Sequence, residues 1–158
     1  IKHWSKTLWF YLAFIVVSAY WLEFAGVYTG LIFGEYWYGK ALGIALWNVP
    51  IIIGVNWFIM VYTSAALTTL FRLQNEWLNA AIGASWMVFA DLFLESLAPK
   101  LDFWYWNDGA APLQNYVAWW LAAFIFQIIL HKLKLHENNP VARLLYVLQV
   151  VFFFIQNS

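Results

Sequence analysis

The chain has 158 residues, of which 65% are hydrophobic and 10% are charged, whereas soluble domains average about 45–50% and about 25%. This composition excludes a soluble fold and predicts a single integral membrane domain over residues 1–158, with room for roughly five spans of about 20 residues each. The net charge is zero, no basic tract is present and Cys is absent, so nucleic-acid binding, disulfides and thiolate chemistry are excluded as well.

The first predicted span runs from about residue 7 to residue 22 and ends at Glu23. A basic cluster of Lys2, His3 and Lys6 precedes it, as is common at a membrane boundary. No small-residue cleavage site follows the apolar run, so we expect no signal peptide. The chain begins with Ile1 rather than Met, which is consistent with a missing upstream segment.

Residues 23–47 interrupt the apolar pattern with five glycines placed among charged and aromatic residues. Irregular backbone is tolerated at membrane depth only where protein or a cavity covers it, so a re-entrant or interfacial segment that packs inside the bundle is one prediction. Gly26, Gly30 and Gly34 also keep the spacing of close helix packing. Both interpretations stay open at this point.

Four more spans follow in the sequence. The second is predicted to begin with Asn48 as its cap and Pro50 in its first turn, and to end near Leu70. The others are predicted over residues 77–97, 113–130 and from Pro140 to about 156, with a loop over residues 100–112. The predicted fold is therefore all-α: a polytopic transmembrane helix bundle of about five spans plus the Gly- and aromatic-rich segment.

Basic residues are distributed unequally between the two predicted sides. Lys40 and Lys100 lie on one side, and six lie on the side of the N-terminus. Because cytoplasmic loops carry the excess of Lys and Arg, the N-terminus is predicted to be cytoplasmic. The six are Lys2, Lys6, Arg72, Lys132, Lys134 and Arg143.

Two acidic residues, Asp91 and Glu95, fall inside the third span and one helical turn apart, so they share a face. That face continues through Ala80, Ala84 and Met87. A carboxylate in a span costs at least about 2.5–3.5 kcal/mol and usually faces the bundle interior. Two like charges this close disfavour double ionisation, so at least one is expected to stay protonated as a candidate acid. A purely structural role in holding helices together stays open.

Polar and aromatic side chains could surround these acids. Asn48, Asn56, Asn115 and Gln127 are the candidate hydrogen-bonding partners, and each alone is more typical of helix contacts than of catalysis. Aromatic residues make up 22% of the chain, and most of the Trp residues are expected at the membrane interfaces. The rest could line a pocket that suits a polyene or a carbocation, which aromatic ring faces attract.

Cofactor and metal signatures are absent from the sequence. His3, His131 and His136 lie near span ends without metal or haem spacing, so we expect solvated side chains rather than ligands. No Lys lies within a span to carry a retinal Schiff base, and no phosphate or nucleotide motif is present. The sequence predicts neither a metal nor a cofactor.

Two strings, GLIFGEYWYGKALGIALWNVPIIIGVNWFIMVYTS over residues 30–64 and DLFLESLAPKLDFWYWNDGAAPLQNYVAWW over residues 91–120, resemble the carotenoid biosynthesis membrane protein family. That family contains carotenoid hydratases of the bisanhydrobacterioruberin hydratase type. Ser96, Ala110 and Ala111 depart from its pattern, and the chain is shorter than such proteins, which is consistent with a missing N-terminal span. The matching positions are Val49, Pro50, Asp91, Glu95, Trp104, Trp106, Gly109, Pro112, Asn115 and Trp119.

The resemblance implies addition of water to the terminal double bond of a linear or monocyclic carotenoid end group, without a redox cofactor, in a prokaryotic cytoplasmic membrane. Protonation of that bond gives a tertiary cation, so the site needs a buried acid, a cation-tolerant wall and one held water. Asp91 is the predicted acid, and Glu95 or Asp102 is predicted to position the water and accept its proton. The predicted substrate-binding residues are Tyr38, Trp104, Trp106, Asn115, Trp119 and Asn48.

Other functions begin from the same residues. Lycopene-type end-group cyclisation starts with the same protonation but excludes water. A non-catalytic subunit that binds carotenoid or braces a larger membrane complex would use Asp91 and Glu95 only as helix contacts. Ion or proton transport is less favoured, because only one predicted span carries the acids. A carotenoid and the lipid bilayer are the expected partners, with further membrane proteins or a second copy of the chain left open.

Overall fold

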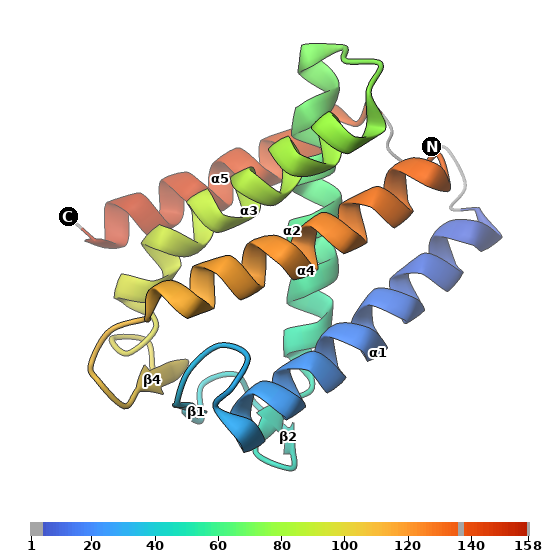
Figure 1. Cartoon of the computed structure of the whole chain (residues 1–158). Coiled ribbons are helices and arrows are strands. Elements are labelled where there is room, and N and C mark those ends of the chain that lie inside the picture. Colours follow the sequence, from blue (N-terminus) through green and yellow to red (C-terminus); the bar gives the residue numbers. More distant parts are fainter. Residues whose placement is uncertain (1–4, 136–137, 158) are drawn as a thin grey trace.

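The computed structural model describes residues 5–135 and 138–157 and contains five long helices (Figure 1). All five are long and apolar enough to cross a membrane, which confirms the predicted five-span bundle. The sequence-based predictions on Lys2, His3 and His136 lie outside the described residues. The helices are α1 (Lys6–Thr29), α2 (Ile52–Thr68), α3 (Glu76–Leu97), α4 (Leu113–Lys132) and α5 (Pro140–Asn157), and a 3-10 turn, Thr69–Phe71, extends α2.

Helix α2 is the centre of the bundle and packs against the other four helices. In α2 with its 3-10 turn, 61% of the span is buried, whereas in α5 the buried share is 11%. Close approach of α1 to α2 depends on Gly54, because a Cβ there would lie 2.4 Å from the carbonyl oxygen of Val16. This contact holds the middle of α1 against the first turn of α2, next to the cavity described below.

Helix α1 is longer than predicted. Its N-cap is Ser5, whose side chain accepts a hydrogen bond from the Leu8 N–H, and it ends at Gly30, which has a left-handed φ of 65°. The prediction that the span ends at Glu23 is therefore wrong. The residues after Glu23 continue the helix for nearly two turns, and Gly30 is the stop signal. Glu23 is consequently inside the helix and only 3% exposed.

The Gly- and aromatic-rich segment forms a small cap at one end of the bundle (Figure 1). Strand β1 (Tyr36–Tyr38) pairs antiparallel with β4 (Trp104–Trp106), which lies in the loop between α3 and α4. Strands β2 (Ala45–Leu46) and β3 (Val49–Pro50) form a separate hairpin. From Gly30 onward the segment is non-helical, as one interpretation predicted, whereas residues 23–29, which include Gly26, belong to α1.

The hairpin corrects the predicted start of the second span. Trp47 and Asn48, between β2 and β3, have φ values of 49° and 60°, which is the backbone of a tight two-residue hairpin turn. Helix α2 begins only at Ile52, after an N-cap residue that makes no side-chain cap hydrogen bond. Asn48 is therefore an exposed turn residue rather than a helix cap, and Pro50 ends a strand.

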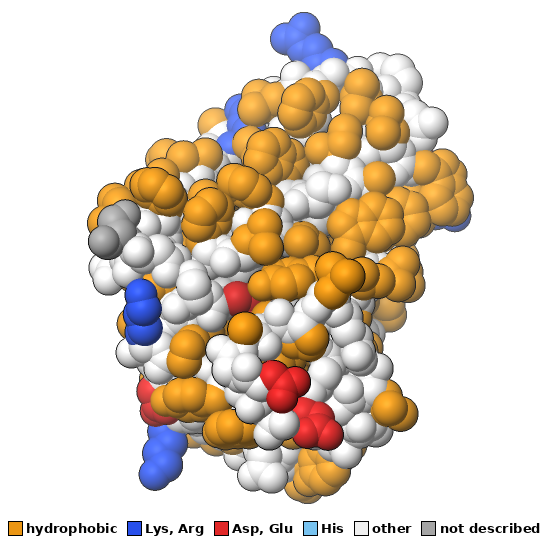
Figure 2. All heavy atoms as spheres, turned by 60° about the vertical axis from the view of Figure 1, so that its left-hand side comes forward, with side chains coloured by type: hydrophobic (Ala, Val, Ile, Leu, Met, Phe, Trp, Pro, Cys, Tyr) orange, Lys and Arg blue, Asp and Glu red, His pale blue; other side chains and the backbone are white. Residues whose placement is uncertain are grey.

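The helix ends separate the described basic residues as the sequence analysis expected. Lys6 opens α1, Arg72 follows the 3-10 turn and Lys132 closes α4, while Lys40 and Lys100 lie in the segments that form the cap. Figure 2 shows hydrophobic side chains over much of one face of the helices, with the acidic ones from its middle downward, toward the end that carries the cap. Such an apolar helix surface suits contact with lipid.

Candidate functional site

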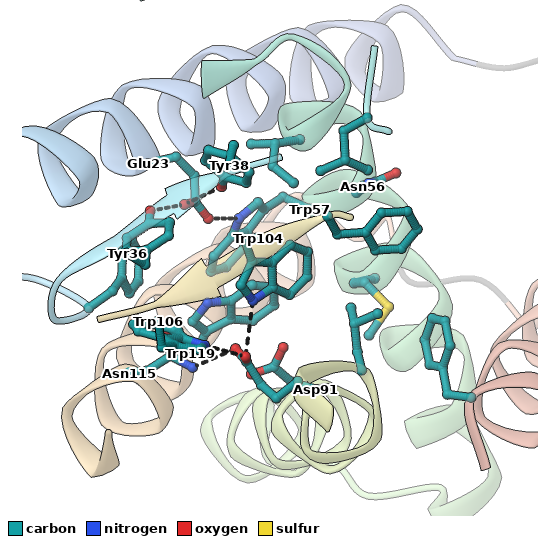
Figure 3. Close-up of a pocket in the computed structure, with 18 of the residues that line it drawn as sticks. Glu23, Tyr36, Tyr38, Asn56, Trp57, Asp91, Trp104, Trp106, Asn115 and Trp119 are labelled. Atoms are coloured by element: carbon teal, nitrogen blue, oxygen red, sulfur yellow. Dashed lines mark hydrogen bonds between the residues drawn. The ribbon is translucent and has the colours of Figure 1, made fainter. Parts of the chain in front are cut away.

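A cavity of about 260 Å³ lies inside the bundle beneath the β1–β4 pair, and every one of the five helices contributes to its wall (Figure 3). Most of the lining is aromatic or aliphatic, as in small-molecule sites generally. Seven of the nine residues predicted from the sequence line it, namely Asp91, Glu95, Tyr38, Trp104, Trp106, Asn115 and Trp119.

Glu95 is the best-coordinated acid of the cavity. Its Oε2 atom accepts hydrogen bonds from the indole nitrogens of Trp104 at 3.0 Å and Trp106 at 2.6 Å. Its Oε1 atom accepts one from the Asn115 amide, also at 3.0 Å. Asn115 is in the first turn of α4, so the carboxyl of α3 is bound by one strand and one neighbouring helix.

Asp91 lies one turn earlier on the same buried face and is 1% exposed. Ala80, Ala84 and Met87 are fully buried, which confirms that this face of α3 points into the bundle. Within the part of the chain that the structure describes, neither Asp91 carboxyl oxygen has a hydrogen-bond partner. The Asn115 amide lies beside Asp91 but outside good hydrogen-bond geometry. A buried carboxyl without donors is unusual, since buried polar groups are nearly always satisfied.

Glu23 is a third carboxyl in the cavity, and the sequence analysis missed it. Its Oε2 atom accepts hydrogen bonds from the hydroxyls of Tyr36 at 2.6 Å and Tyr38 at 2.8 Å, and its Oε1 atom accepts one from the Trp57 indole at 2.8 Å. The signal that could have found it is Gly30, because a helix that ends there holds Glu23 nearly two turns from its end.

The β1–β4 pair links the two hydrogen-bonded acids. In its register Tyr36 faces Trp106 and Tyr38 faces Trp104, so these four side chains share one face of the ribbon. The Tyr pair donates to Glu23 and the Trp pair donates to Glu95. On the other face Trp37 stacks on Tyr105 with ring centroids 5.9 Å apart. Strand periodicity therefore directs all four donors into the bundle.

Aromatic rings complete the wall. Trp57 of α2 stacks on Trp119 of α4 with ring centroids 4.1 Å apart, and the ring centroids of Tyr36 and Trp106 are 5.0 Å apart. None of the lining residues, all within the described ranges, is Lys, Arg or His. The cavity thus combines three carboxyl groups with aromatic faces, an arrangement suited to a positive charge rather than an anion.

A second hollow, of about 250 Å³, adjoins the first at Trp106, which lines both. Its other walls include Glu35, Asn107, Asp108 and Gln114, from the cap and the first turn of α4. The half-buried residues of the main cavity are mostly apolar and include Leu94 of α3 and Phe153 of α5. The main cavity is therefore bordered both by partly exposed apolar helix surface and by a polar hollow.

Asp102 and Asn48 do not line the cavity. Asp102 has a positive φ of 55°, and its carboxylate accepts hydrogen bonds from the Lys40 backbone N–H and the Tyr105 hydroxyl. The structure therefore places it as a link between the two loops of the cap. The Lys40 N–H, more than the Tyr105 hydroxyl, lowers the pKa of Asp102 below its ordinary value of 3.8. The ionised Asp102 therefore stabilises the cap at pH values above 3.8. This stabilisation is lost as the pH falls through the lowered pKa.

We expect Asp102→Asn to keep turnover within about threefold of the native protein, because the side chain holds the cap and does not reach the cavity. Steady-state turnover of the purified protein is the measurement. A decrease in turnover of more than about 100-fold with an unchanged fold would show that Asp102 takes part in the reaction.

His131 and Gln127 lie away from the cavity. His131 is 1% exposed at the end of α4, so the prediction of a solvated side chain is wrong. It shares a buried helix face with Gln127, one turn earlier, whose amide donates to the Val61 carbonyl and the Ser64 hydroxyl of α2. Gln127 is thus a helix contact, as predicted. Across residues 5–135 and 138–157 no group of three potential metal ligands is found.

The sequence is similar to those of known proteins. The sequence model of a family described as carotenoid biosynthesis protein matches residues 1–157. The chain belongs to the carotenoid biosynthesis protein family. Bisanhydrobacterioruberin hydratase of Haloarcula japonica is 30% identical over 122 residues, which are 72% of this chain and 41% of that protein. The chain spans about two fifths of the length of that relative. No solved structure matches.

Family membership confirms the resemblance seen in the two sequence strings. It assigns the chain to carotenoid biosynthesis, and the five apolar helices indicate an integral membrane protein. The relative named as a hydratase is distant, so membership alone does not specify the reaction of this chain.

Proposed function

We propose that this family member adds water to the terminal carbon–carbon double bond of a linear or monocyclic carotenoid end group and gives a tertiary alcohol without a cofactor. One observation carries the proposal: Asp91, a buried carboxyl with no hydrogen-bond donor among the described residues, lies one turn from Glu95, a carboxyl with three donors, in an aromatic cavity. The pair supplies a proton donor and a proton acceptor to the same small space.

Asp91 is the proposed proton donor. Three carboxyl groups share a cavity whose lining, within the described residues, has no basic side chain, so full ionisation would carry a high electrostatic cost. Glu23 and Glu95 each accept three hydrogen bonds, which stabilise a negative charge. Asp91 accepts none from the part of the chain that the structure describes, so the neutral, proton-bearing form is least costly there.

Glu95 is the proposed acceptor. Asp91 transfers its proton to the less substituted carbon of the double bond, and the two π electrons form the new C–H bond, which leaves a tertiary cation on the other carbon. A water oxygen then bonds to the cation, and the water gives one proton to the Glu95 carboxylate. Transfer of that proton back to Asp91, past the Asn115 amide that lies beside both acids, completes the cycle.

The ring faces of Trp104, Trp106 and Tyr38 are proposed to lie near the cation. Aromatic faces attract positive charge by about 0.5–2 kcal/mol each, most strongly where water is excluded. The proposed route for the polyene is the apolar rim near Leu94 and Phe153, and the proposed route for water is the polar hollow on the other side of Trp106. Separate routes would keep bulk water from the cation until one molecule is held in place.

The deciding experiment is expression in a host that makes linear or monocyclic carotenoids, followed by mass analysis of the extracted pigment. The proposal expects a product heavier by one water molecule, whose oxygen comes from isotopically enriched water. A product of unchanged mass with a new ring would instead identify an end-group cyclase. Pigment that copurifies with the protein and is never converted would identify a binding subunit.

We also propose that the N-terminus faces the cytoplasm of a prokaryotic inner membrane, because the described basic residues outside the cap outnumber Lys40 and Lys100. The chain has no Cys, so single-Cys variants can be labelled cleanly. With a membrane-impermeant maleimide on intact cells, Ala110→Cys in the cap loop is expected to react, and Gln74→Cys between α2 and α3 only after permeabilisation. The opposite pattern would reverse the orientation.

A further inference from the structure

Glu23 takes no part in the proton transfers proposed above, yet it is one of the most elaborately bound side chains of the cavity. It comes from α1, is 3% exposed, and accepts hydrogen bonds from β1 and from α2. All three donors are neutral groups, so they satisfy the carboxylate oxygens without cancelling the charge. The described lining of the cavity contains no basic side chain that could do so.

Aromatic rings surround this acid. Tyr36 and Trp57 present their polar atoms to Glu23, and their rings extend into the wall of the cavity (Figure 3). Trp57 is stacked on Trp119, and Tyr36 is packed on Trp106. A carboxylate held among aromatic rings in a mostly apolar cavity is a preorganised environment for positive charge.

We propose that Glu23 and these rings form a binding site for a lipophilic cation with three alkyl substituents at its charged centre. In the reaction proposed above, on which this inference rests for its natural occupant, the cation is the tertiary carbocation that follows protonation by Asp91. Glu23 forms and breaks no covalent bond. It supplies a fixed negative charge opposite the acid, so the positive charge develops between two walls of the cavity.

In the test, the protein is held in nanodiscs of uncharged lipid and titrated with each of two probes. Neither titration involves turnover. The probes are dodecyltrimethylammonium and its carbon isostere, in which a tert-butyl group replaces the trimethylammonium group. Quenching of the protein's Trp fluorescence measures the binding of each probe, and empty nanodiscs serve as blanks. The native protein is expected to bind the ammonium at least about tenfold more tightly than the isostere.

Glu23→Gln keeps a side chain of the same shape and is expected to remove most of the preference for the ammonium, while affinity for the isostere changes by less than about twofold. Glu35→Gln is the matched control, because Glu35 is exposed and does not line this cavity, and it should retain the full preference. Thermal unfolding in the same nanodiscs shows whether each variant is folded. If Glu23→Gln does not fold, Glu23→Asp, which retains the charge, is expected to retain the preference.

Equal binding of the two probes by the native protein would overturn the inference, as would an undiminished preference in folded Glu23→Gln. The proposed hydration is tested separately by its product. Absence of the tertiary alcohol together with a Glu23-dependent preference would refute hydration and support the cation site. Formation of the alcohol by a protein that binds the two probes equally would support hydration and refute the cation site.

Discussion

Asp91→Asn is expected to abolish the hydrated carotenoid, with turnover lowered by about 10²–10⁴-fold, the usual contribution of a positioned general acid. Asparagine has nearly the same shape as aspartic acid but carries no transferable proton. The Asp91 oxygens have no hydrogen-bond partner within the described structure, so no existing bond is lost. The substitution therefore separates the chemistry of this side chain from its packing.

Pigment extracted from matched expression cultures provides the measurement, together with the amount of variant found in the membrane fraction. Glu76→Gln is the control, because Glu76 is exposed in the first turn of the same helix and lines neither the main cavity nor the second hollow. It should form product at the native level. Unchanged product from a well-inserted Asp91→Asn variant would show that another group supplies the proton.

Two substitutions of Glu95 are expected to have different effects, one on turnover and one on folding. Glu95→Gln keeps an oxygen acceptor and similar volume but removes the charge, so turnover should fall by about 10²–10³-fold in a folded protein. Glu95→Ala leaves the two indole N–H groups and the Asn115 amide without their acceptor. Each buried unsatisfied donor costs about 1–3 kcal/mol, and this variant should lose much of its folded population.

Product formation measures the first effect, and thermal unfolding in detergent, followed by Trp fluorescence, measures the second. Glu76→Gln is a suitable comparison, since Glu76 is exposed in the first turn of the same helix. Its expected effect is limited to the small contribution of an acid near a helix N-terminus, about 0.3–1 kcal/mol. Native turnover by Glu95→Gln would contradict the role of its charge.

The β1–β4 ribbon explains why the two hydrogen-bonded acids belong to one unit. Tyr36 and Tyr38 are in the segment before α2, whereas Trp104 and Trp106 follow α3. Pairing of the strands places all four on one face, and each acid is reached by donors from its own strand. A change in either strand would therefore disturb both acids.

The local sequence was sufficient to predict the membrane class, the number of spans and the interior face of α3. Each follows from properties that do not depend on distant residues: length of apolar runs, the stop signals between them, and the helical spacing of Asp91 and Glu95. The aromatic and amide residues near those acids were also identified, because Trp104, Trp106, Asn115 and Trp119 stand at positions that match the pattern of the family.

Only the tertiary structure identified Glu23 as part of the cavity and placed Asp102 and Asn48 outside it. Glu23 meets Tyr36, Tyr38 and Trp57 because α1 lies against α2 at Gly54 and because β1 pairs with a strand more than 60 residues away. Hydropathy and periodicity report how a segment is buried, but not which distant segment covers it. The partners of each buried acid are therefore decided by packing between elements.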